Sequence, residues 1–173
     1  MNTIYTIGHS TRSSDEFLAI LKAFAIELLA DIRTVPGSRR NPQYDQKSLR
    51  SFLALNGIEY IHLPGLGGLR RPKKDSPNTG WINESFRGYA DYMQSAEFEA
   101  AIEDLIARAA VARTAIMCAE AVPWRCHRSL VGDALVARGI EVEDIMSEKS
   151  AKTHKLTAWA RVDGFAVSYP EPE

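Results

Sequence analysis

The chain has 173 residues, 45% of them hydrophobic and 25% charged, which is enough for one globular domain and too few for two comfortable ones. Because 21 Lys and Arg side chains nearly balance 22 Asp and Glu side chains, the net charge of −1 excludes a uniformly basic or acidic protein. Two cysteines exclude a disulfide scaffold, and no signal-peptide pattern or membrane-length apolar run occurs, so we expect a cytoplasmic protein without a membrane partner.

The first part of the chain alternates strand and helix patterns. Residues 3–7 predict a strand, and Ser13 with Glu16 forms a capping box that predicts the start of a helix. Residues 28–32 predict a second strand. Residues 33–38 then predict a loop, because the proline and glycine within them interrupt regular structure.

The next part carries a second helix, a third strand and a long loop. Asp45 is placed to cap the helix and Gly57 to follow its last turn, and residues 58–63 predict the strand. Residues 64–81 are rich in glycine and in basic side chains, which predicts a functional or mobile loop. Its glycines at 65–68 are too irregular for a dinucleotide-binding fingerprint and fit the hinge of a flap.

The second half continues the alternation. Apolar side chains at helical spacing predict helices over residues 86–93, 98–109 and 130–135, the last closed by Gly139. Residues 114–118 and 140–146 predict a fourth and a fifth strand, and the tail predicts a hairpin around Asp163-Gly164.

This order of elements predicts a three-layer α/β fold. A mostly parallel, Rossmann-like sheet of about five strands in the order 3-2-1-4-5 would carry helices on both faces. We expect one domain over residues 1–173, with residues 148–173 as a C-terminal extension packed on it. In such a sheet, ligands bind at the carboxyl edge where the strand order reverses.

Reactive side chains gather at this expected edge. The segment 116–129 carries two thiols, a carboxylate, an imidazole and two guanidinium groups between a strand and a helix. Gly8-His9-Ser10 and Cys118-Ala119-Glu120 would line the same crevice, with Asp31 and Arg33 beside it.

Four residues are candidate catalytic residues: Glu120, Cys126, His127 and His9. Glu120 is placed for acid–base work or for a ribose hydroxyl, and its structural alternative is an ion pair with a nearby arginine. His9 lies at a strand end, where it could either take part in catalysis or form a hydrogen bond to a neighbouring loop.

We expect different roles for the two cysteines. Cys126 precedes a helix among cationic neighbours, so we expect its thiol pKa to fall below the free value of about 8.5. Its alternative is a small buried residue, and Cys118 within an apolar strand is expected to be core. Neither thiol has the Cys-x5-Arg spacing of a phosphatase loop or the spacing of a rhodanese-like loop. Paired ligand spacings such as C-x2-C are absent too, so we predict neither a metal nor another cofactor.

Arginines and glycines at the edge predict an anion site. Arginine suits bidentate phosphate contacts, and the start of the helix near Cys126 would add backbone N–H donors. The alternatives are internal ion pairs and, for the basic loop residues, a solvated surface. The expected anion- and substrate-binding residues are Gly8, Ser10, Asp31, Arg33, Ser38, Gly67, Gly68 and Arg128. The basic loop residues are Arg39, Arg40, Arg70, Arg71, Lys73 and Lys74.

Four motifs together resemble the domain of unknown function family 488. They are TIGHS at 6–10, DIRTVPGSR at 31–39, LPGLGG at 63–68 and CAEAVPWRCHR at 118–128, and the similarity continues into the tail. The resemblance implies a bacterial or archaeal cytosolic α/β protein and carries no established reaction. Its motif residues here include Pro36 and Cys118 besides the candidate residues above.

These observations favour an enzyme that acts on a phosphorylated small molecule or nucleotide, or within nucleic acid. A non-catalytic module that binds nucleotides or nucleic acid through the same basic edge is the alternative, and a metal protein is a third. Nothing in the sequence specifies an oligomeric state.

Overall fold

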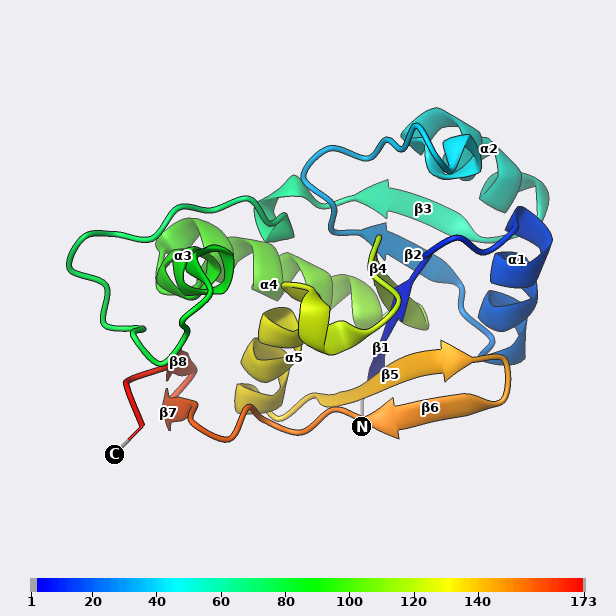
Figure 1. Cartoon of the computed structure of the whole chain (residues 1–173). Coiled ribbons are helices and arrows are strands. Elements are labelled where there is room, and N and C mark those ends of the chain that lie inside the picture. Colours follow the sequence, from blue (N-terminus) through cyan, green and yellow to red (C-terminus); the bar gives the residue numbers. More distant parts are fainter. Residues whose placement is uncertain (1–2, 173) are drawn as a thin grey trace.

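The computed structural model describes residues 3–172, in which six strands form one sheet with helices on both faces (Figure 1). The strands are β1 (Thr3–Gly8), β2 (Leu28–Asp31), β3 (Glu59–His62), β4 (Thr114–Cys118), β5 (Glu141–Ser147) and β6 (Ser150–Thr153). The helices are α1 (Ser14–Ala23), α2 (Gln46–Leu55), α3 (Glu84–Tyr92), α4 (Ala96–Ala109) and α5 (Arg128–Ala137). A separate hairpin follows, made of β7 (Arg161–Asp163) and β8 (Ala166–Ser168). The expected fold class, a mostly parallel α/β sheet with a C-terminal hairpin, is confirmed.

Local side-chain contacts explain where the helices begin and end. The capping box at α1 is confirmed, because the Ser13 hydroxyl accepts from the Glu16 backbone N–H and Glu16 accepts from the backbone N–H of Ser13. Asp45 stands at the start of α2 without capping it, since its carboxylate accepts the Ser38 N–H instead. Gly57 follows α2 with φ of 76°, a left-handed conformation that favours glycine.

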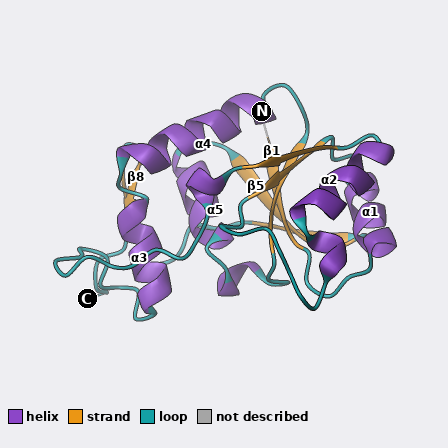
Figure 2. Cartoon of the chain, turned by 90° about the horizontal axis from the view of Figure 1, so that it is seen from above, coloured by secondary structure: helices purple, strands orange, loops and turns teal. Residues whose placement is uncertain are grey.

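The sheet separates two apolar cores. Along β1, Ile4 packs on one face, whereas Tyr5 and Ile7 pack on the other, as the alternation of a strand requires. Figure 2 shows the result: α1 and α2 cover one face, and α3, α4 and α5 cover the other. The three expected layers are therefore present.

The central strand order differs from the expected 3-2-1-4-5. The sheet runs β3-β2-β4-β1-β5-β6, so β4 lies between β1 and β2. Both strands are apolar and buried, and burial alone does not choose between the two arrangements. A Cβ on Gly8 would overlap the carbonyl oxygen of Glu120, so glycine lets β1 and β4 run side by side past their ends, a neighbour relation that both orders share.

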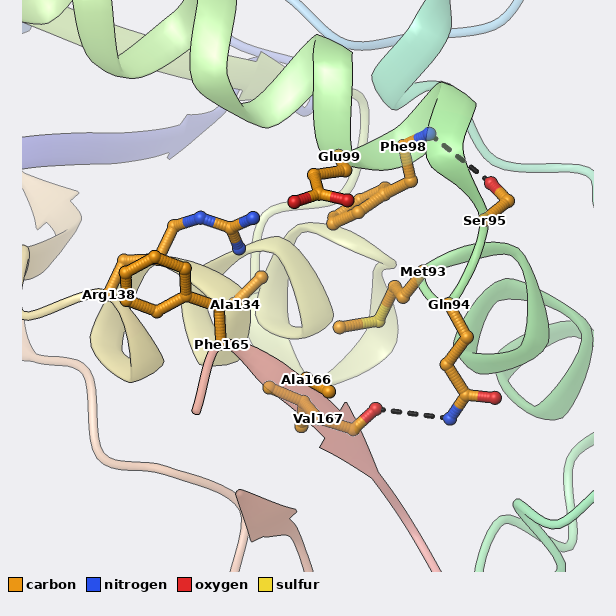
Figure 3. Close-up of a pocket in the computed structure, with 10 residues that line it drawn as sticks. All are labelled: Met93, Gln94, Ser95, Phe98, Glu99, Ala134, Arg138, Phe165, Ala166 and Val167. Atoms are coloured by element: carbon orange, nitrogen blue, oxygen red, sulfur yellow. Dashed lines mark hydrogen bonds between the residues drawn. The ribbon is translucent and has the colours of Figure 1, made fainter. Parts of the chain in front are cut away.

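Two further strands complete the C-terminal part. β6 pairs antiparallel with β5 and was missed in the sequence, because its SAKT segment carries no apolar alternation. The expected hairpin at Asp163-Gly164 is present, and it packs against α4 and α5 around a small cavity of about 180 Å³ (Figure 3). There the Arg138 guanidinium lies 5.0 Å from the centre of the Phe165 ring. Of the domain expected over residues 1–173, residues 1–2 and 173 lie outside the described range.

Candidate functional site

A cavity of about 350 Å³ opens at the carboxyl ends of β2 and β4, and we call it the edge cavity. The segments after β2 and β4, the loop after β3, and helix α3 enclose it. Its lining residues are Arg33, Thr34, Val35, Gly37, Gly68, Leu69, Ser85, Phe86, Tyr89, Cys118, Ala119, Glu120, Arg125, Cys126 and His127. Three of the four candidate catalytic residues, Glu120, Cys126 and His127, are thus brought together.

The revised strand order explains which candidates are left out. Since β4 separates β1 from β2, the cavity opens between β2 and β4, and the segment Gly8-His9-Ser10 lies on the other side of β4. That segment still continues the pairing with β4, because the His9 and Ser10 N–H groups donate to the carbonyl oxygens of Cys118 and Ala119. Ser38 also lies off the cavity, where its hydroxyl accepts the Asn41 N–H.

The loop after β3 packs closely against the cavity wall. A Cβ on Gly68 would lie 3.1 Å from Nδ1 of His127, and one on Gly67 would lie 2.6 Å from the Thr34 hydroxyl oxygen. Thr34 donates from that hydroxyl to the Gly68 carbonyl at 2.9 Å. The two glycines therefore allow close backbone approach to His127 and Thr34.

Arg33 is held in a buried ion pair. Its Nε and Nη2 donate to the two carboxylate oxygens of Asp31 at 2.9 and 2.8 Å, and Tyr60 also donates to Asp31 at 2.5 Å. Although burial opposes it, the Asp31 carboxylate raises the pKa of Arg33 above its ordinary value. The side chain of Arg33 is only 7% exposed. Asp31 occupies the Nε and Nη2 donors of its guanidinium, which are therefore not available to a ligand. For Arg33, the structure therefore shows the internal ion pair that the sequence analysis gave as the alternative to anion binding.

His9 is buried next to Arg33 and contacts its guanidinium. Its ring stacks on Tyr44 with centroids 4.2 Å apart, its Nδ1 lies 2.8 Å from the Ser10 carbonyl, and its Nε2 lies 3.4 Å from Arg33 Nη1. Burial lowers the pKa of His9, which favours a neutral ring with the proton on Nδ1. The unprotonated Nε2 is then free to accept from Arg33.

His127 is neutral and fixed in one tautomer. Burial lowers its pKa to about 4. Nε2 lies 3.1 Å from the carbonyl oxygen of Ile32, which only accepts, so Nε2 carries the proton. Nδ1 is then unprotonated and lies 3.5 Å from the sulfur of Cys126.

The expected acidity of Cys126 is reversed in the structure. The hydrogen bond with the Cys118 thiol raises the pKa of Cys126 above its ordinary value, and burial raises it further. The pKa of Cys118 is lowered despite its burial, through the hydrogen bond from Cys126 and the charge of Arg128. The prediction of a lowered pKa at Cys126 is therefore wrong, since the backbone N–H and the charge of Arg128 do not outweigh the neighbouring sulfur and burial.

Glu120 and Arg125 are the exposed charged groups of the edge cavity. Within residues 3–172, the Glu120 carboxylate forms no ion pair, whereas its backbone carbonyl accepts from Arg128 at 3.0 Å. Arg128 itself is fully buried and does not line the cavity, so the structure gives it no direct access to a ligand.

The sequence interpretation missed the apolar wall. Val35 and Leu69 are 74% and 85% exposed, and Phe86 and Tyr89 of α3 complete this side of the cavity. The last two were expected only as core residues of a helix. Large apolar side chains exposed beside a polar cavity are a sign of ligand contact, but they become recognisable only when α3 is placed over the carboxyl edge.

Among residues 3–172, no three His, Cys, Asp or Glu side chains are arranged to hold a metal ion. None of the helices described in that range is both long and apolar enough to cross a membrane.

The fold and the edge cavity define an α/β protein with a ligand-sized cavity at the carboxyl edge of a mostly parallel sheet. A family model described as "Domain of unknown function DUF488" matches residues 13–135, and the chain belongs to this family. No curated protein and no solved structure matches the chain.

Proposed function

We propose that the protein is an enzyme that acts on a phosphorylated, nucleotide-like ligand in the edge cavity. The observation that carries this proposal is that Glu120, Arg125, Cys126 and His127 line the same cavity. Acid–base, anion-binding and thiol groups are thus brought within one volume, which is the arrangement that catalysis requires.

The shape of the cavity supports a ligand with a flat apolar part. A volume of about 350 Å³ lies in the range that accommodates small ligands. Phe86 offers ring surface on one wall, backed by the buried Tyr89, and Val35 and Leu69 offer exposed aliphatic surface. A nucleobase would pack against such a wall, as aromatic side chains stack on bases.

The charges support an anionic group on the same ligand. Arg125 lines the cavity and is exposed, so its guanidinium is free to meet a phosphate. Arg33 lines the cavity too, but its N–H groups are taken by Asp31, Tyr44 and His9, which leaves one N–H of Nη1 for a ligand. Glu120 would then act as the acid or base, since its exposed carboxylate shares the cavity.

Ligand titration tests this proposal. Adenosine monophosphate, ribose 5-phosphate and a short oligonucleotide are titrated by calorimetry at low and moderate salt. We expect binding that weakens with salt and falls about tenfold or more in Arg125→Ala. Arg161→Ala is the matched control, because Arg161 is an exposed arginine on β7, away from the cavity lining. The absence of binding by all three probes at low salt would overturn the phosphate assignment.

The exposed basic side chains of the loop after β3 favour a second candidate, a non-catalytic nucleic-acid-binding module. Arg71, Lys73 and Lys74 are exposed there, which suits contacts with a phosphate backbone. Glu120→Gln separates the two candidates. If the protein is an enzyme, this variant should still bind the ligand but should no longer form product. Product formation is measured by mass spectrometry of the ligand after incubation with the protein. In a binding module, neither the wild type nor the variant forms product.

A further inference from the structure

One buried cation lacks the carboxylate partner that the other buried cations have. Arg33 pairs with Asp31, and the ring of His154 pairs with Asp133 and Asp144. Arg128 is 0% exposed, and no carboxylate oxygen of the described residues lies within 4.0 Å of its guanidinium. A buried guanidinium without a counter-charge is strongly unfavourable, so a negative group is expected beside it.

The contacts of Arg128 leave one group able to carry that charge. Its Nη1 lies 3.3 Å from the sulfur of Cys118 and 3.0 Å from the carbonyl oxygen of Glu120, and its Nη2 lies 3.3 Å from the carbonyl oxygen of Ala121. Carbonyl oxygens supply only partial charge. The thiol of Cys118 is the contacting group that can ionise.

Cys118 also has access to the edge cavity. It is the last residue of β4 and lines the cavity together with Cys126, although only 2% of its surface is exposed. Cys126 lines the same cavity, with its sulfur 3.5 Å from Nδ1 of His127. Cys118 therefore contacts the Arg128 guanidinium and also lines the edge cavity.

We propose that Cys118 is a thiolate paired with Arg128 and is the nucleophile of the edge cavity. In the reaction, the sulfur lone pair forms the new bond to the electrophilic atom, and the departing group leaves with the electron pair of the broken bond. The assignment of a nucleophile rests on the proposed function, whereas the ionisation of Cys118 does not. The pKa shifts point the same way, since that of Cys118 is lowered and that of Cys126 is raised.

The two cysteines allow a direct test, because each single replacement leaves one thiol in the chain. In Cys126→Ala, the ultraviolet absorbance of the thiolate is followed against pH, and we expect Cys118 to ionise below the free value of about 8.5. In the matched Cys118→Ala variant, Cys126 keeps its burial but has no guanidinium contact, so it should ionise at a higher pH than Cys118 does in Cys126→Ala. A Cys118 midpoint at or above the free value in folded Cys126→Ala would overturn the proposal, and so would a lower midpoint for Cys126 than for Cys118.

Arg128 is tested in the Cys126→Ala background. Arg128→Met removes the charge and should raise the Cys118 midpoint by about one pH unit or more. An unchanged midpoint in a folded variant would contradict the pairing. If Arg128→Met does not fold, Arg128→Lys keeps the positive charge and should keep the midpoint below the free value, while a midpoint above it would count against the proposal.

Nucleophilicity is measured with iodoacetamide as the electrophile, where the S–C bond forms and iodide leaves with the electrons of the C–I bond. At neutral pH we expect Cys118 in Cys126→Ala to react about tenfold or more faster than Cys126 in Cys118→Ala, as located by peptide mass spectrometry. Equal or reversed rates would overturn the assignment of the nucleophile. These measurements use no ligand, so their failure and the failure of phosphate binding are distinguishable.

Discussion

His154 gives the sharpest prediction for stability. Its Nε2 lies 2.9 Å from a carboxylate oxygen of Asp133, and its Nδ1 lies 3.2 Å from one of Asp144. The His154 side chain is 8% exposed. Burial alone would lower its pKa, but the two hydrogen-bonded carboxylates outweigh burial and raise the pKa to about 9. The ring is therefore a buried imidazolium between two carboxylates near neutral pH.

The direction of the pH dependence follows from this raised pKa. The folded protein holds the proton up to about pH 9, whereas the unfolded chain loses it near pH 6.5. The contribution to stability is thus fully present below about pH 6.5 and is lost as the pH rises through 9. A difference of this size corresponds to about 3 kcal/mol in the free energy of unfolding.

Urea unfolding of the wild type and of His154→Gln checks this prediction. At about pH 6 the variant should be less stable by roughly 2 to 3 kcal/mol, and the difference should shrink at about pH 9.5. Both proteins keep the two cysteines, so thiol ionisation affects both and largely cancels in the comparison. A difference that stays constant across this range would refute the paired imidazolium.

The remaining predictions concern the carboxyl edge. Gly8→Ala should lower the free energy of unfolding by about 3 kcal/mol or more, because its Cβ would overlap the Glu120 carbonyl; thermal unfolding measures this. Arg33→Ala should cost roughly 3 to 5 kcal/mol in urea unfolding, since it leaves the buried Asp31 carboxylate without its cation. Glu120→Gln should change the free energy of unfolding, measured by urea unfolding, by less than about 0.5 kcal/mol, because the side chain is exposed and forms no ion pair in residues 3–172. A large loss of stability in Glu120→Gln would indicate a structural role for this carboxylate.

Much of the fold follows from local patterns in the sequence. The capping box at Ser13, the glycine after α2 and the Asp163-Gly164 turn each depend on neighbouring residues only, and each is present. The position of β4 depends on which apolar strand pairs with which, and two buried parallel strands carry no such information in their composition. β6 was missed for a related reason, since an exposed edge strand needs no apolar face.

That some candidate residues would lie close together could be predicted from the sequence, but their contacts could not. Strand ends and the segment 116–129 place Glu120, Cys126 and His127 at the carboxyl edge, and the structure brings them to one cavity. The partners of the arginines were left open, because Asp31 and Glu120 both lie near them. In the structure Arg33 pairs with the Asp31 carboxylate, whereas Arg128 contacts Glu120 through its backbone carbonyl and not through its carboxylate.

Because Arg128 has no carboxylate partner, the lowered thiol pKa that the sequence predicts for Cys126 is instead found at Cys118. The helix start at Arg128 offers the sulfur of Cys126 a backbone N–H at 3.5 Å, which is a dipole without net charge. The guanidinium of the same residue carries a full charge and lies 3.3 Å from the sulfur of Cys118, in a buried place where charge interactions are strong. Because the adjacent sulfurs cannot both ionise at little cost, the charge belongs on the one that faces the guanidinium. The position of β4 between β1 and β2 places Cys118 near the centre of the sheet. There its sulfur contacts the guanidinium of Arg128, which has no carboxylate partner, and this contact favours the thiolate form of Cys118.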